Sequence, residues 1–122
     1  MGTVEMFAET PRWGHNERTA RLGLLADDAR HALERAQRGE EEAIAGWLAY
    51  GAALNEGRAL LPGDLEFGHW LRSAKLAEGM HDHERAAAMW AAANPDQFAE
   101  ARAASNARTV RGIHAKWKEL EA

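Results

Sequence analysis

The sequence predicts an all-α protein: a compact bundle of five to six helices, with a long helical hairpin, a short helix-turn-helix-like pair and a C-terminal basic helix. Two observations predict this class. Alanine is abundant while valine, isoleucine and threonine are few, a bias that favours helix over strand. Apolar residues also recur at spacings of three and four, which places them on one helix face. We expect one domain at positions 17–122, preceded by an arm at positions 1–16.

The first long helix is expected at about positions 16–38. Its apolar face consists of Leu22, Leu25, Ala26, Ala29, Leu33 and Ala36. Asn16 is a candidate N-cap, and Gly39 would end the helix. The preceding arm contains Pro11 and Gly14, which favour irregular backbone.

A second long helix is expected from position 40 to about position 61, ended by Pro62 and Gly63. Its apolar stripe consists of Ile44, Trp47, Leu48, Gly51, Leu54 and Leu61. The helix also contains three interior glycines, Gly46, Gly51 and Gly57. Each costs about 1 kcal/mol relative to alanine inside a helix. Their presence therefore indicates either close approach by another helix or a bend.

Two shorter helices are expected at about positions 65–76 and 83–93, with Asp64 and Asp82 as candidate N-caps. The turn between them contains Gly79, which can take a positive φ. Two short helices joined by a tight turn resemble the helix-turn-helix motif, whose second helix reads DNA in the major groove.

The second short helix is a poor reader of base edges. It begins with His83, Glu84 and Arg85 and continues mostly with alanine, and Glu84 would face phosphate unfavourably. Plain packing of two helices therefore remains the alternative to DNA contact.

A fifth, short helix is expected from Asn94 and Pro95 to about Ala103, because Asn suits the N-cap and Pro the first helical position. The last helix is expected at about positions 106–120, capped by Ser105. Its apolar stripe consists of Val110, Ile113, Trp117 and Leu120. The expected anchors of the whole core are large aromatic residues: Trp47, Phe67, Trp70, Trp90 and Trp117.

Composition excludes several classes of protein. The formal net charge of −4 excludes a wholly basic coat for nucleic acid but not a local basic face. Without cysteine, the chain has no disulfide and no thiolate metal site. The N-terminus lacks the pattern of a signal peptide, and no apolar run is long enough to span a membrane. We therefore expect a cytoplasmic protein without membrane contact.

The strongest charge signal is a basic segment at positions 102–118, which carries five Arg or Lys residues and no Asp or Glu. Such a segment can contact several phosphates, pair with an acidic partner, or simply be solvated. The candidate nucleic-acid contacts are Arg108, Arg111, Lys116 and Lys118, joined by Arg72, Lys75 and Arg85. Arg108, Arg111 and Lys118 are expected on one face of the last helix.

The first half of the chain is acidic instead, with 11 acidic and 7 basic residues at positions 1–64. An acidic helical face can bind a basic groove on another protein, or it can simply favour solubility. The candidate partner-binding residues are Asp27, Asp28, Glu34, Glu40, Glu41 and Glu42.

Signals of catalysis and of metal binding are weak. The sequence has no Gly-rich phosphate loop, nucleophile elbow or helical HExxH pattern. His81 and His83 flank Asp82 and could share a metal ion, but a solvated turn with a helix cap is the favoured interpretation. We therefore expect no enzymatic activity, no cofactor and no bound metal.

Positions 30–93 carry a pattern that resembles an uncharacterised family of phage, prophage and plasmid proteins. The matching residues are Gly57, Arg58, Leu61, Pro62, Phe67, Gly68, Trp70, Leu71, Ala87 and Met89, with His31 to Ala36 similar to the leading helix of that family. The chain departs from the family where it has Gly63-Asp64-Leu65 in place of a His-Gly pair. It departs again at Asp82 to Arg85, where the family has Ser-x-Arg-Thr. The resemblance implies a mobile-element origin and a helix-turn-helix-like pair.

Two hypotheses of function follow. The first is a non-enzymatic, DNA-associated regulator or accessory factor of a phage or other mobile element. It would act as a homodimer, because one module with so few basic residues would bind weakly. The alternative is a phage-encoded inhibitor, anti-CRISPR-like, that binds a host defence protein complex through the acidic helical surface.

Overall fold

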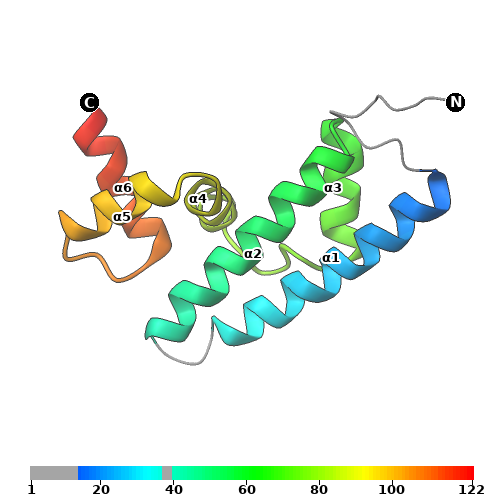
Figure 1. The fold of residues 1–122 in the computed structure, drawn as a ribbon, viewed down its shortest axis with the longest axis horizontal. Coiled ribbons are helices and arrows are strands. Elements are labelled where there is room, and N and C mark those ends of the chain that lie inside the picture. Colours follow the sequence, from blue (N-terminus) through cyan, green and yellow to red (C-terminus); the bar gives the residue numbers. More distant parts are fainter. Residues whose placement is uncertain (1–13, 37–39) are drawn as a thin grey trace, which may run out of the picture.

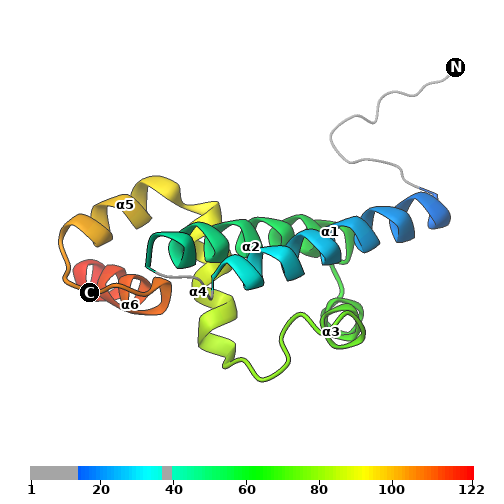
Figure 2. The same ribbon diagram turned by 90° about the horizontal axis from the view of Figure 1, so that it is seen from below.

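The computed structural model describes residues 14–36 and 40–122, which form six helices and no strand. The helices are α1 (His15–Arg35), α2 (Glu40–Leu60), α3 (Asp64–Ser73), α4 (Asp82–Ala93), α5 (Pro95–Ala103) and α6 (Val110–Glu121). The all-α class predicted from the sequence is therefore confirmed. In two views, α1 and α2 lie side by side, α3 lies near one end of this hairpin, and α5 and α6 lie at the opposite end of the molecule (Figures 1 and 2).

The α1–α2 hairpin is a close packing of small residues. The buried face of α1 consists of Leu25, Ala26, Ala29 and Ala32. On the α2 side, a Cβ atom at Gly46 would lie only 2.5 Å from the carbonyl oxygen of Ala32. The glycine therefore lets the two backbones approach more closely than any other residue would permit.

The other interior glycines of α2 serve the same purpose. A Cβ atom at Gly51 would lie 2.0 Å from the carbonyl oxygen of Ala88, where α4 crosses α2. A Cβ atom at Gly57 would lie 2.4 Å from the ring of Trp70, which α3 places against α2. Of the two interpretations of these glycines, the structure confirms close approach by another helix.

The core is divided into two clusters. The first joins α1, α2 and α3, with residues of the following connection and Ala88 of α4, and its largest members are Leu25, Tyr50, Leu54, Phe67, Trp70 and Leu76. The second joins α4, α5 and α6 to the start of α2, through Ile44, Ala87, Phe98, Ala101, Val110 and Ile113. Trp47 packs against both clusters. Phe67 and Trp70 are buried as predicted, whereas Trp47, Trp90 and Trp117 are only half-buried because they lie at the edges of these clusters.

The two short helices differ from the predicted helix-turn-helix-like pair. The connection between α3 and α4 runs over positions 74–81, longer than the three or four residues of that motif. The closely packed helix pairs are α1–α2, α2–α4, α4–α5, α4–α6 and α5–α6. The pair α3–α4 is not among them. Instead, the buried hydroxyl of Tyr50 on α2 holds the connection by donating a hydrogen bond of 2.7 Å to the carbonyl oxygen of Leu76.

The N-caps of α1, α3, α4 and α6 differ from the predicted residues. The N-cap of α1 is Gly14, whose N–H donates to Glu17 at 2.7 Å, rather than Asn16. The N-cap of α3 is Gly63 rather than Asp64. The N-cap of α4 is His81 rather than Asp82, and the Nδ1 of His81 accepts a hydrogen bond of 3.2 Å from the N–H of His83.

The last helix begins four residues later than predicted. Ser105 does not cap it, because its hydroxyl accepts a hydrogen bond of 2.9 Å from the N–H of Ala107. Thr109 is the N-cap instead, and its hydroxyl accepts from Gly112 at 3.0 Å. Helix α1 begins at His15, within the range 1–16 predicted as an arm, and the rest of that range up to position 13 lies outside the described residues, as does Gly39.

Candidate nucleic-acid interface

Helix α6 presents two of the predicted phosphate contacts on one exposed face. Val110 and Ile113 are buried against α4 and α5, which fixes the orientation of the helix. Arg111 and Lys118 are both exposed on another side, and seven residues separate them. Seven residues are nearly two full turns, so the two side chains leave the helix in almost the same direction, about 10 Å apart along its axis.

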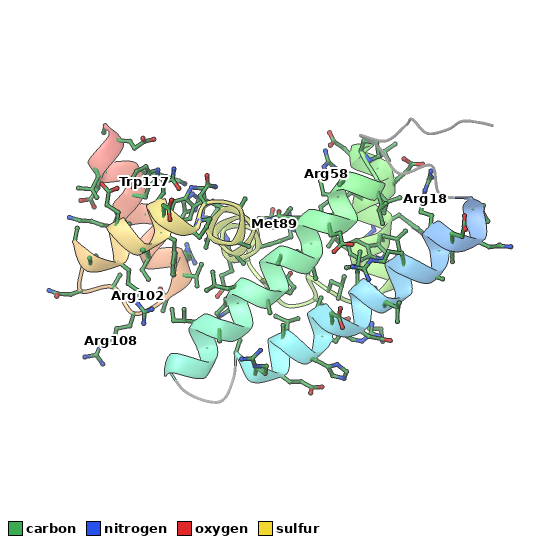
Figure 3. The ribbon with its side chains drawn as sticks, viewed as in Figure 1. Arg18, Arg58, Met89, Arg102, Arg108 and Trp117 are labelled. Carbon is green, nitrogen blue, oxygen red and sulfur yellow. The ribbon has the colours of Figure 1, made fainter. Side chains whose placement is uncertain are left out.

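The other two contacts predicted in this segment lie elsewhere. Arg108 is not on the face shared by Arg111 and Lys118, because it precedes the first residue of α6. Lys116 lies on a different side of α6 and forms an ion pair of 3.6 Å with Glu119. Figure 3 shows Arg102 and Arg108 at the end of the molecule opposite Arg18 and Arg58. The basic segment thus forms one end of the molecule rather than one stripe.

His114 adds no full positive charge to this end of the molecule at neutral pH. Its ring stacks on the indole of Trp90, with centroids 4.5 Å apart and planes inclined by 21°. Burial between α4 and α6, helped by the nearby charge of Lys118, holds the pKa of His114 below its ordinary value. The arginines and lysines therefore carry the charge of the segment.

Arg72 and Arg85 lie together, away from α6. With Arg58 they line a cleft of about 570 Å³ between the end of α2, α3 and the start of α4. Lys75 follows α3, where it takes a left-handed backbone conformation with φ of 59°, and its side chain is exposed outside the lining of this cleft. Of the seven predicted nucleic-acid contacts, four therefore lie in the 102–118 segment and two in this cleft, and Lys75 belongs to neither group.

One of the acidic candidates is paired with a neighbouring arginine. Asp27 forms an ion pair with Arg30 one turn along α1. Asp28 and Glu34 are exposed on the same helix. The side chains of Glu40, Glu41 and Glu42 lie outside the described part of the structure. The described part of the predicted acidic surface is therefore small.

His81 and His83 lie close together, with ring centroids 4.6 Å apart. The sequence favours a solvated turn with a helix cap over a metal site here, and the structure has such a cap, although His81 Nδ1 forms it rather than Asp82. Within residues 14–36 and 40–122, no three His, Asp or Glu side chains are grouped so that they could hold a metal ion. None of the described helices is both long enough and apolar enough to cross a bilayer.

An apolar hollow of about 600 Å³ lies between α2, α4 and α5, and the sequence did not predict it. Its walls include Leu48, Ala91, Pro95 and Phe98, and Arg102 is the one titratable residue among those described as lining it. An acid, a base or a nucleophile is thus missing from this lining. The sequence gives little indication of the hollow, because the alanines that line it are also typical of closely packed helices.

Comparisons of the chain with protein-family models, with curated proteins and with solved structures found no match.

Proposed function

We propose that the protein is a non-enzymatic, DNA-associated regulator or accessory factor of a phage or other mobile element, and that it contacts the DNA backbone through residues 102–118. The observation that carries this proposal is the unmixed positive charge of that segment at one end of an otherwise acidic molecule. Elsewhere the chain has a net charge of −9, which repels DNA and leaves this end to face it.

The start of α6 supports the same orientation. Helix N-termini attract anions because their first N–H groups lack partners within the helix. The first turns of α1, α3, α4 and α5 each contain an acidic residue, whereas that of α6 contains none and is flanked by Arg108 and Arg111. A phosphate approaching α6 therefore meets the helix dipole and side-chain charges of favourable sign.

The number of contacts also suggests the assembly. Arg111 and Lys118, with Arg102 and Arg108 nearby, supply at most a few phosphate contacts for each chain. A surface of this size binds weakly at physiological salt, so we propose a homodimer, which would bring two such surfaces to one duplex.

The proposed mobile-element origin rests on the resemblance noted in the sequence. The residues that carry it lie in α2, α3, α4 and the connections between them, where Gly57 contacts Trp70 and where Phe67, Leu71 and Ala87 are buried. These five are packing residues, so the resemblance supports a shared fold more directly than a shared activity.

Fluorescence anisotropy with a labelled duplex of about 25 base pairs, titrated at several salt concentrations, tests the DNA contact. Arg111→Ala and Lys118→Ala should each weaken binding and should each lower the slope of log K against log salt by about 0.9, the value for one lost phosphate contact. Arg18→Ala is the matched control, because it removes one exposed charge from the opposite end of the molecule (Figure 3). Absence of binding to any duplex at tens of micromolar protein in low salt would end the proposal.

The alternative, an inhibitor of a host defence complex, draws less support from the described surface. Asp27 is paired with Arg30, and Glu56 at the far end of the hairpin is paired with Arg21 at 2.5 Å. These pairs reduce the net negative field that a basic partner would meet. A pull-down that recovers a host protein complex, with loss of the complex in an Asp28→Lys, Glu34→Lys variant, would favour this alternative.

A further inference from the structure

The cleft between α3 and α4 brings together three arginines that are distant in the sequence. Arg58 comes from the last turn of α2, Arg72 from the last turn of α3 and Arg85 from the first turns of α4. The rest of its lining consists of Phe67, Gly68, Leu71 and Ala77 with two largely exposed aspartates, Asp64 and Asp82. We propose that this cleft binds a small organic phosphate, with the phosphoryl group held by the three guanidinium groups.

Arg58 and Arg85 are partly buried, whereas Arg72 is exposed. The guanidinium of Arg58 lies over the ring of Phe67, 5.1 Å from its centroid. A guanidinium nitrogen of Arg72 lies 3.3 Å from the position of a Cβ atom at Gly68, so this glycine leaves room for the side chain to lie back along α3. Held over this ring, Arg58 loses little freedom when an anion binds.

The two aspartates can be displaced. Arg58 pairs with Asp64 at 2.5 Å, and Arg85 pairs with Asp82 at 3.4 Å. The arginine side chains are 37% and 28% exposed, whereas the aspartate side chains are 92% and 82% exposed. The carboxylates therefore reach inward from solvent, and ion pairs of this exposed kind contribute little to stability.

Arg72 lacks such a partner among the described residues. A phosphoryl group can accept hydrogen bonds from several guanidinium groups at once, through oxygens that match the planar fork of arginine. An anion that satisfies Arg72 while it replaces Asp64 and Asp82 on the other two arginines gains contacts that neither aspartate provides. The cleft chemistry thus favours a dianionic phosphate over the monoanionic carboxylates already present.

The size and lining of the cleft indicate a small ligand. Its volume of about 570 Å³ falls within the range of about 300–1,000 Å³ that is usual for small-molecule sites. Phe67, Leu71 and Ala77 offer an apolar wall beside the arginines, which suits an organic group attached to the phosphate. The site is distinct from residues 102–118, so it can be tested independently of DNA binding by that segment.

The test is isothermal titration of the full chain with inorganic phosphate and with a nucleoside monophosphate, and with the unphosphorylated nucleoside as the blank. Amide shifts of Gly68 and Ala77 in heteronuclear NMR locate the binding. We expect saturable binding of both phosphates, tighter for the monophosphate, and none of the nucleoside. Absence of any shift or heat up to about 10 mM phosphate, a free energy weaker than about −3 kcal/mol, would overturn the proposal.

Three variants sharpen the result. A double variant, Arg72→Gln with Arg85→Gln, should weaken binding at least tenfold, whereas the matched control Arg18→Gln should leave it unchanged. Asp64→Asn should tighten binding several-fold because it removes a competing carboxylate, and an unfolded chain could not produce that gain. Equal weakening by Arg18→Gln, or no gain from Asp64→Asn, contradicts the proposal.

A final titration uses a short single strand and a short duplex of DNA. A small-ligand site is supported if DNA fails to displace the bound monophosphate, or displaces it only when the concentration of DNA phosphate groups is as high as that of the monophosphate. Amide shifts at Gly68 and Ala77 that occur with DNA but not with either small phosphate would overturn the small-ligand assignment.

Discussion

The carbonyl oxygen of Ala88 on α4 lies 2.0 Å from the position that a Cβ atom at Gly51 on α2 would occupy. Both residues are buried, and the atom on the α4 side is backbone, which cannot rotate away. The crossing of the two helices, which joins the two core clusters, therefore depends on the absence of a side chain at one position.

Gly51→Ala should destabilise the protein, by about 1–3 kcal/mol or more, because the added methyl group forces α4 away from α2. Urea unfolding followed by circular dichroism measures the change. Gly23→Ala is the matched control: this glycine lies inside α1, and apart from the adjacent residues and backbone of its own helix no atom lies within 4 Å of the added Cβ. There alanine should stabilise the fold by about 0.5–1 kcal/mol, and a similar gain at Gly51 would contradict the described crossing.

Tyr50→Phe should cost about 1–2 kcal/mol of unfolding free energy. The substitution keeps the ring in place but removes the hydrogen bond of 2.7 Å to the carbonyl oxygen of Leu76, which is left without this donor in the core. The loss should be accompanied by faster amide exchange in the 74–81 connection, since the bond holds that connection to α2. Unchanged exchange there would show that other contacts hold the connection.

How much of this could be predicted is clearest in α2. Apolar periodicity and Pro62 predict its extent to within a residue, and the three interior glycines predict either a close neighbour or a bend, of which the structure has the close neighbour. The helix extent and the close approach both follow from residues within this one helix, and the structure confirms both. The identity of the neighbours, α1 at Gly46 and α4 at Gly51, depends on tertiary packing and is absent from the local pattern.

The start of α6 shows where local signals fail. Ser105 and Thr109 are both good N-cap residues, and nothing in their immediate sequence chooses between them. The burial of Val110 and Ile113 against the second cluster favours Thr109, while Ser105 turns its hydroxyl to Ala107. Because of that shift, Arg108 leaves the helix, and the predicted three-residue face is reduced to Arg111 and Lys118.

The arginine cleft could not have been predicted from spacing. Arg58, Arg72 and Arg85 lie on three different helices, and intervals of 14 and 13 residues correspond to no single periodicity. The sequence marks Arg72 and Arg85 only as basic residues near an expected helix pair. Their common cleft follows from the long connection between α3 and α4, which the sequence suggested would be a tight turn.

The ionisation of Tyr50 offers a spectroscopic test of the core. It is the one tyrosine of the chain, so tyrosinate absorbance reports a single group. Burial raises the pKa of Tyr50 far above its ordinary value, and the charge of Arg85 offsets this only in part. The neutral phenol is thus favoured in the folded state, and stability should fall as the pH rises above about 10, where the unfolded chain can ionise. Tyrosinate absorbance should appear only together with loss of helical circular dichroism, and its appearance in a still-folded protein would contradict the described burial.

Protonation of His114 should weaken the docking of α6 on α4. Its folded-state pKa lies below the ordinary value of about 6.5, owing to burial first and to Lys118 second. As the pH falls, the unfolded chain therefore takes up the proton before the folded one does. The neutral imidazole of His114 makes its full contribution to stability above about pH 6.5, and this contribution declines as the pH falls through and below that value.

His114→Phe retains an aromatic ring against Trp90 but cannot titrate, and it should remove this part of the pH dependence. Lys118→Met should reduce it, because one of its two causes is lost. Urea unfolding at pH 7.5 and pH 5 for the three proteins measures the difference, and an equal fall in stability in all three would mean that other groups cause it.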